Sequence, residues 1–197
     1  MIVQAPDGAD GIEIHVEGDG AETIVMVHGW PDTYRLWDAQ VAFLKSRYRC
    51  VRFTLPGFDI AKARQACSID QIAEFLRQVV ERVSPGRKVT LLLHDWGCAF
   101  GYQFYARFPE LVARVVGVDI GDTRGLKHTL SPRAKFLMMA YQWWLSLAWF
   151  VGGRLGDRMA LQMKRWMRSR SDERFIGSCM CYPYYLSWFG GRRSYRP

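Results

Sequence analysis

Several signatures of other protein classes are missing from this sequence of 197 residues. Its five cysteines include no CxxC pair, which argues against a disulfide framework and a zinc site, so we predict reduced thiols and neither metal nor cofactor. Residues 1–11 contain acids and no long apolar core, which argues against a cleavable secretory signal and predicts a cytoplasmic protein. No Gly-x-Ser-x-Gly motif occurs, which argues against an ordinary serine esterase or lipase.

Acidic residues are scarce in the last third of the chain. Residues 1–123 contain 13 Lys/Arg and 16 Asp/Glu, whereas residues 124–197 contain 14 and 3. Such a basic segment attracts nucleic acid or anionic lipid. Because its cations are scattered among Trp and Met at helical spacing, we favour a solvated helix face, with no nucleic-acid partner and only weak association with a membrane surface.

What is present is an alternation of strand and helix patterns. Five apolar segments have strand character, and a helix that begins with a capping box at Ser68 and Gln71 follows the third of them. Strands that alternate with helices predict an α/β fold, with a mostly parallel sheet flanked by helices. The predicted strands are residues 12–16, 23–27, 51–55, 89–93 and 115–120.

The pattern changes after Ser131, where helices without strands begin. We therefore predict a core over residues 1–130 and a helical lid or cap over residues 131–197. Within the second segment, residues 136–153 contain no charge over 18 positions, the lower limit for a helix that spans a membrane. Gln142, Ser146, the glycines at 152–153 and an apolar content rich in Trp instead of Leu argue against a spanning helix. An interfacial helix and a buried or lid helix are the alternatives, and we favour the buried or lid helix.

The most informative residue is Asp95, which follows the apolar strand 89–93 and precedes Trp96, Gly97 and a helical stretch. Such a turn lifts one side chain above the carboxyl edge of the sheet, next to the N-terminal amides of the following helix. A carboxylate in that position can attack carbon as a nucleophile. The alternative is that Asp95 only caps the following helix.

A second loop at the carboxyl end of a predicted strand has the sequence His-Gly-Trp-Pro-Asp at residues 28–32. The backbone amides of Trp30 and Trp96 can converge as an oxyanion hole. His28, Trp30 and Trp96 are also candidates for substrate binding. The alternatives are structural roles for His28 and His94 and a pocket-wall role for the two indole rings.

These loops and the helical insertion resemble the α/β-hydrolase fold, specifically its epoxide hydrolase and haloalkane dehalogenase branch. The resemblance extends from about residue 12 to the end of the chain and implies that Asp95 attacks an epoxide or a carbon–halogen bond to form an alkyl ester. Dehalogenases often have Asn where this chain has Trp30, so epoxide hydrolysis is favoured. Epoxide hydrolases also use lid tyrosines as proton donors, for which the candidates are Tyr182, Tyr184 and Tyr185, with Tyr141 as a further one.

Three departures from the family pattern qualify the resemblance. Leu93 lies two residues before the nucleophile, where the family usually has a small residue, so a slightly more open turn is expected. The family's catalytic histidine follows its final strand, but no histidine occurs in residues 129–197. Of the two family positions for the charge-relay acid only the earlier one exists, where Asp122, or else Asp119, is the candidate.

The family normally continues with two further strand–helix units, so the chain is expected to stop within or just after the lid. Strand 115–120 would then be an exposed apolar edge of an incomplete core. The resemblance implies an epoxide-hydrolase-like enzyme for small lipophilic substrates that forms the covalent ester and turns over very slowly. The alternatives are a haloalkane-dehalogenase-like hydrolase, a non-catalytic binding or interaction protein on the same scaffold, and a membrane-associated protein that uses residues 136–153. The sequence carries no signal for an oligomeric state.

Overall fold

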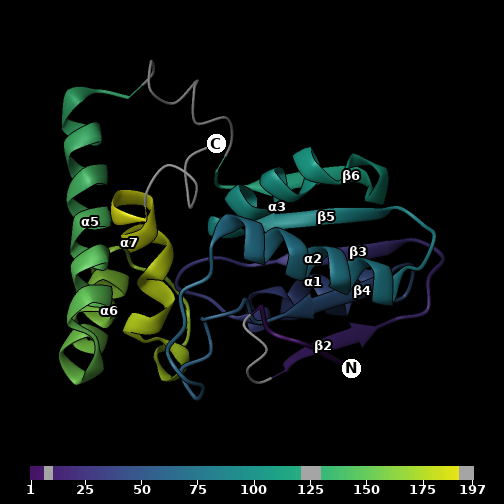
Figure 1. Ribbon diagram of the computed structural model, residues 1–197, viewed down its shortest axis with the longest axis horizontal. Coiled ribbons are helices and arrows are strands. Elements are labelled where there is room, and N and C mark those ends of the chain that lie inside the picture. Colours follow the sequence, from purple (N-terminus) through teal and green to yellow (C-terminus); the bar gives the residue numbers. More distant parts are fainter. Residues whose placement is uncertain (7–10, 121–129, 191–197) are drawn as a thin grey trace.

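The computed structural model describes residues 1–6, 11–120 and 130–190. Its centre is a six-stranded sheet in the order β1-β2-β4-β3-β5-β6 (Figure 1). The last four strands in this order are parallel to one another, whereas β2 is antiparallel to both β1 and β4. The predicted α/β fold with a mostly parallel sheet is therefore confirmed. The strands are β1 Ile2–Val3, β2 Ile12–Glu17, β3 Thr23–Val27, β4 Arg49–Phe53, β5 Val89–His94 and β6 Val112–Val118.

Helices cover both faces of the sheet. On one face, α1 (Asp38–Leu44) shares a cluster of buried apolar side chains with Met26 of β3. On the other face, α2 (Ile69–Val83) and α3 (Trp96–Arg107) share a larger cluster with Val25 of β3. Neighbouring residues of a strand point to opposite faces, so the continuous apolar run of β3 requires cover on both sides.

The predicted capping box begins α2. The hydroxyl oxygen of Ser68 accepts a hydrogen bond from the backbone N–H of Gln71 at 3.2 Å, and Oε1 of Gln71 accepts one from the backbone N–H of Ser68 at 2.8 Å. The helix ends at Val83, before Pro85 and Gly86. Both ends are therefore set by local chemistry that the sequence reveals.

The short strand β1 was not predicted, and among the five predicted strands β6 deviates most from its predicted bounds. It covers Val112–Val118, so it begins three residues before the predicted segment 115–120 and ends two residues before its end. It is the last strand of the sheet, and the side chains of Val116 and Val118 are 48% and 49% exposed. The expected exposed apolar edge is confirmed for the described residues.

Three α-helices make up most of the segment of residues 131–190, here called the helical segment: α5 (Pro132–Val151), α6 (Gly153–Trp166) and α7 (Tyr182–Phe189). Two short 3-10 helices, Glu173–Phe175 and Ser178–Cys181, lie between α6 and α7. The hydroxyl of Ser131 caps α5, where the sequence pattern changes. Helix α5 packs against both α6 and α7, and the three helices lie at one end of the sheet (Figure 1). None of the helices in the described ranges combines the length and hydropathy that crossing a membrane requires.

Aromatic side chains attach the helical segment to the core. The buried Tyr182 donates its hydroxyl hydrogen to the carbonyl oxygen of Pro56 at 3.0 Å, and its ring packs edge-on against Phe58. The guanidinium carbon of Arg64 lies 3.7 Å from the ring centre of Trp149 in α5, a cation–π contact. These contacts hold α7 over the loops that follow the parallel strands.

Candidate active site

Asp95 lies in a strained turn between β5 and α3. Its backbone angles are φ 50° and ψ −123°, a region that L-residues other than Gly rarely adopt. Holding such a conformation costs on the order of 1–3 kcal/mol, which the surrounding packing must offset. The turn directs the carboxylate of Asp95 toward the loop of residues 28–32, as its hydrogen bonds show.

One oxygen of the Asp95 carboxylate is held by two backbone amides. Oδ2 accepts hydrogen bonds from the N–H of Trp30 at 2.9 Å and from the N–H of Trp96 at 2.6 Å. Trp30 lies 65 residues before Asp95 in the chain, in the loop that follows β3. Trp96 is the residue directly after Asp95 and the first residue of α3. The other oxygen, Oδ1, accepts no hydrogen bond from any described residue. It is the oxygen with lone pairs left for chemistry.

This arrangement differs from an ordinary helix cap. A capping carboxylate accepts from the second or third amide of its own helix, whereas Asp95 accepts from the first amide of α3 and from a separate loop. Gly29 makes the approach of that loop feasible, because a Cβ atom there would lie 2.4 Å from the nitrogen of Trp96 and 2.5 Å from Oδ2 of Asp95. The geometry therefore matches two converging donors around one oxygen.

Burial raises the pKa of Asp95 to about 7. The two amide hydrogen bonds oppose this effect, since they favour the charged form, while the negative charges of Asp119 and Asp32 add to it. Near neutral pH the carboxylate is thus poorly solvated and partly protonated. A poorly solvated carboxylate is a stronger nucleophile than one exposed to water.

The structure separates the candidate tyrosines by position. The ring of Tyr184 lies edge-on to Trp96 at 5.2 Å, to Trp30 at 6.1 Å and to Tyr141 at 6.0 Å, with the centres of the rings as reference points. Burial raises the pKa of Tyr184 and of Tyr141, and the nearby charge of Asp95 adds to both. Both phenols are therefore protonated at neutral pH, and both lie within reach of the charge of Asp95.

The other two tyrosines lie elsewhere. The hydroxyl of Tyr182 is bonded to Pro56, at the attachment between the helical segment and the core. The ring of Tyr185 packs against Phe189 within α7 at 5.1 Å. The charge of Asp95 acts on Tyr184. Sequence patterns do not rank the three neighbouring tyrosines, because their side chains differ only in helical position.

His28 fixes the loop that carries Trp30. Its ring is completely buried; Nε2 accepts a hydrogen bond from the backbone N–H of Leu55 at 2.9 Å, and Nδ1 lies 3.0 Å from the carbonyl oxygen of Gly29. Burial lowers the pKa of His28 to about 4, so the ring is neutral. Both ring nitrogens of His28 are therefore engaged within the fold.

His94 faces a second pocket, away from the hydrogen bonds of Asp95. This pocket has a volume of about 740 Å³ and is also lined by Asp32 and Ser171. Nδ1 of His94 is buried and has no hydrogen-bond partner among the described residues. Burial raises the pKa of Asp32, and its hydrogen bond with Ser171 opposes that shift. The sequence analysis gave Asp32 no role, although it ends the His-Gly-Trp-Pro-Asp motif.

Of the two candidate relay acids, Asp122 lies outside the described residues. Asp119 follows β6 with a φ of 81°, and its charge contributes to the raised pKa of Asp95. The end of β6 is held by α3, because the hydroxyl of Tyr102 donates to the carbonyl oxygen of Ile120 at 2.9 Å. Asp119 is thereby kept on the same edge of the sheet as Asp95.

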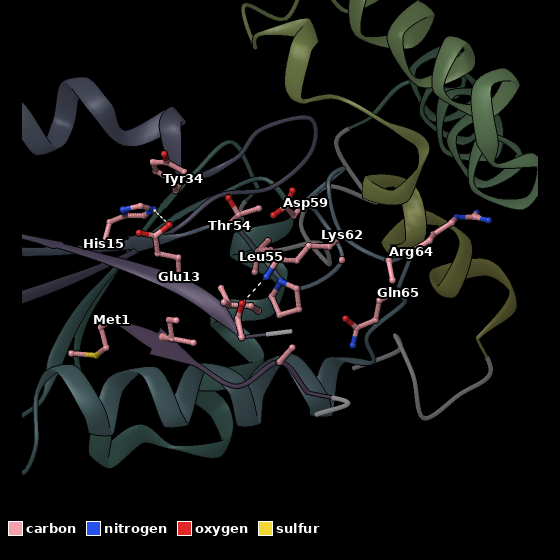
Figure 2. Close-up of a pocket in the computed structure, with 17 residues that line it drawn as sticks. Met1, Glu13, His15, Tyr34, Thr54, Leu55, Asp59, Lys62, Arg64 and Gln65 are labelled. Atoms are coloured by element: carbon pink, nitrogen blue, oxygen red, sulfur yellow. Dashed lines mark hydrogen bonds and ion pairs between the residues drawn. The ribbon is translucent and has the colours of Figure 1, made fainter. Parts of the chain in front are cut away.

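A further pocket, of about 570 Å³, lies between the N-terminal strands and residues 54–65 (Figure 2). Lys62 donates to the carbonyl oxygen of Gly11 at 2.6 Å, and the ring of His15 stacks on Tyr34 at one rim. Asp95 does not line this pocket. Figure 2 shows the Arg64 side chain directed toward the helical segment, where it meets Trp149.

The bulky residue before the turn is accommodated by a glycine. Leu93 is fully buried, and a Cβ atom on Gly101 of α3 would lie 2.4 Å from one of its methyl groups. Gly101 therefore provides the space that the large side chain of Leu93 requires. The turn at Asp95 still forms both amide hydrogen bonds.

The contact between Gly101 and Leu93 predicts that Gly101→Ala has opposite effects on the free energy of unfolding with Leu and with Ala at position 93. Gly101→Ala is expected to destabilise the protein by about 1 kcal/mol, because overpacking against Leu93 costs about 1–3 kcal/mol and exceeds the helix-propensity gain of about 1 kcal/mol. In a Leu93→Ala background the same change should stabilise by about 1 kcal/mol. Urea unfolding of the four proteins measures both effects, and equal effects of Gly101→Ala in the two backgrounds would contradict the explanation.

Comparison with known proteins agrees with this architecture. The family described as alpha/beta hydrolase fold matches residues 22–175, so the chain belongs to that family. It is 35% identical over 117 residues to the probable oxidoreductase EphD of Mycobacterium tuberculosis, covering 58% of this chain and 20% of that protein. It is 26% identical over 110 residues to epoxide hydrolase 1 of Caenorhabditis elegans, covering 54% and 27%.

Among solved structures, an epoxide hydrolase of Bacillus megaterium in complex with an inhibitor superimposes with a TM-score of 0.73 at 20% sequence identity. That match covers 100% of this chain and 77% of the other. The chain thus spans about a fifth to a quarter of the length of the two curated relatives named above. Two of these proteins, the curated relative from Caenorhabditis elegans and the structure from Bacillus megaterium, are epoxide hydrolases, and this chain is similar to both.

Proposed function

We propose that Asp95 is the nucleophile of an enzyme that opens epoxides of small lipophilic molecules and forms an alkyl–enzyme ester. The observation that carries this proposal is that the two carboxylate oxygens have different hydrogen-bond partners. Oδ2 accepts from the amides of Trp30 and Trp96, and Oδ1 accepts no hydrogen bond from the described residues. One oxygen is thereby fixed while the other can form a bond. The neighbouring rings of Trp30, Trp96 and Tyr184 supply an apolar surface for the substrate.

The bond changes in this step balance within the site. Oδ1 of Asp95 forms a bond to one epoxide carbon while the bond between that carbon and the ring oxygen breaks. The phenol of Tyr184 or of Tyr141 donates a proton to that oxygen, which becomes a hydroxyl group, and the phenolate regains a proton from water. Oδ2 becomes the carbonyl oxygen of the ester and keeps its two amide donors. These donors would then stabilise the negative charge that develops when water attacks the ester.

Hydrolysis of the ester requires a base that activates water. Among the described histidines, none forms a hydrogen bond with Asp95, and His28 has both ring nitrogens engaged. We therefore propose that this chain forms the ester faster than it hydrolyses it. Asp119, and Asp122 outside the described residues, remain the candidates for orienting such a base.

Intact-protein mass spectrometry tests the proposal with styrene oxide as the probe. The protein should gain the mass of one whole epoxide molecule, fragmentation should assign the gain to Asp95, and the rate should rise with pH through about 7, where the carboxylate loses its proton. Diol release should be much slower than labelling. A protein that neither gains mass nor releases diol contradicts the nucleophile, and sustained diol release at the labelling rate contradicts slow turnover.

A bromoalkane serves as the matched second probe. Labelling by the bromoalkane, with release of bromide and without labelling by styrene oxide, would favour the dehalogenase-like alternative. A lack of reaction with both probes would favour a binding protein on the same scaffold. Trp30, which stands where dehalogenases often have Asn, supports the epoxide.

A further inference from the structure

Helix α5 is apolar on its outer face as well as on its inner one. Five large apolar residues follow one another at intervals of three or four positions, which places them on one side of the helix. Their side chains are 44–71% exposed. We call this set the outer stripe: Phe136, Met139, Trp143, Leu147 and Phe150.

The inner face of α5 is already buried. Leu145 and Ala148 are completely covered and belong to the main apolar cluster of the protein. In Figure 1, α5 runs along the outer side of the helical segment, with α7 between it and the sheet. A helix that is apolar all round is normally enclosed on all sides, and a continuous exposed stripe of this kind marks a surface that binds something.

The charges around the outer stripe are almost all positive. Exposed cations lie at both of its ends, at Arg133 and Lys135 before it and at Arg154 and Arg158 beyond it. Residues 131–170 contain a single carboxylate, Asp157. Asp157 is engaged within the fold, because it accepts hydrogen bonds from the backbone N–H and the hydroxyl of Ser178. The surroundings of the stripe are thus complementary to an anionic partner.

We infer that the outer stripe of α5 binds the surface of an anionic lipid bilayer, with the helix lying parallel to the membrane plane. Its Phe, Leu and Met side chains would enter the boundary between headgroups and acyl chains, where Trp143 is also favoured, and the four cations would contact the headgroups. A second copy of this chain fits less well, because a two-fold contact through the stripe would bring like charges together. This inference is independent of the role of Asp95.

Vesicle sedimentation tests the inference on the whole chain. The protein should bind vesicles of phosphatidylcholine with phosphatidylglycerol at least about tenfold more tightly than vesicles of phosphatidylcholine alone. The binding should weaken as salt is added, because the electrostatic contribution is screened. Equal binding to both vesicles would contradict the role of the cations.

Paired variants assign the binding to the outer stripe. The double variant Leu147→Gln/Phe150→Gln should lose at least about tenfold in vesicle affinity, since it removes two apolar anchors. The matched control is Phe43→Gln, which removes an 81% exposed apolar side chain from α1 and should bind as the unmodified protein does. Likewise, Arg154→Gln/Arg158→Gln should weaken vesicle binding. The matched control Arg87→Gln/Lys88→Gln removes two exposed cations that lie before β5, away from the helical segment, and should leave binding unchanged.

The results distinguish a lipid bilayer from a second copy of this chain as the partner of the outer stripe. Loss of binding equally in Phe43→Gln would overturn the inference. A protein that binds neither vesicle but forms a dimer that Leu147→Gln/Phe150→Gln dissociates would show that a second copy covers the stripe. A monomer that binds neither vesicle also overturns the inference. If the variants fail to fold, brominated anionic lipids still give a readout with the unmodified protein, because binding through the stripe should quench tryptophan fluorescence.

Discussion

Asp95→Asn is expected to abolish labelling by styrene oxide, with a loss of at least about a thousandfold in rate. An amide oxygen carries no full charge and cannot form the ester, while the side chain keeps nearly the same size and can still accept from the amides of Trp30 and Trp96. The measurement is the initial rate of mass gain under identical conditions. Asp19→Asn, which changes an exposed carboxyl group, should label at the normal rate. Normal labelling of Asp95→Asn would identify a different nucleophile.

The same substitution is expected to stabilise the fold at alkaline pH. The pKa of Asp95 is raised to about 7 by burial, so the folded protein binds this proton more tightly than the unfolded chain does, and stability falls as pH rises from about 4 to about 7. Asparagine removes this penalty, which for a shift of that size is at most about 4 kcal/mol. The difference in Tm between variant and unmodified protein should be small near pH 4 and reach a plateau above pH 7. A difference that does not depend on pH would show that the carboxylate is well solvated.

Gly29→Ala is expected to lower the labelling rate by about a hundredfold or more. The new Cβ atom would collide with the nitrogen of Trp96 and with Oδ2 of Asp95, so the loop must withdraw and the Trp30 amide loses its contact. Loss of one such donor costs about 10²–10³ in rate in other enzymes, and a displacement of about 1 Å has a similar effect.

A control is needed because Gly29→Ala also strains the fold. Gly86→Ala places a methyl group in open space at a φ of +70°, so it should reduce stability with no effect on the labelling rate. Tm and initial labelling rates of the two variants, compared at a temperature where both are folded, separate the two effects. Similar rates for Gly29→Ala and Gly86→Ala would contradict the role of the Trp30 amide.

Local patterns were sufficient to predict most of the fold. The apolar run of β3 was predicted with the observed bounds, Thr23–Val27, and the capping box gave the start of α2 at Ile69. The bounds predicted for β6 were wrong because the prediction followed the apolar run that begins at Val115. Val112 lies outside that run, since a small and a charged residue come after it. At the edge of a sheet, backbone pairing continues where one face is not buried, so hydrophobicity is a weaker guide there.

The candidate site was partly accessible from the sequence. Trp30 and Trp96 were proposed as converging donors because each follows a predicted parallel strand, and such strands end at one edge of the sheet. The sequence could not indicate which tyrosine lies nearest to the site, because that depends on how α5 and α7 pack on the rest of the protein. Arg64 gave no signal at all, because its partner Trp149 belongs to a distant part of the chain.

Local patterns were sufficient for the order of the five predicted strands and of α2, for the position of the carboxylate after β5 and for the excess of cations after residue 123. These features arise from side-chain periodicity, caps and composition, which act over a few residues. Three features became visible only in the folded molecule: the charge of Asp95 acts on Tyr184, Gly101 makes room for Leu93, and α5 keeps an apolar face outside. Each of these depends on contacts between elements far apart in the chain, whose geometry is fixed by packing of the whole core and not by local preference.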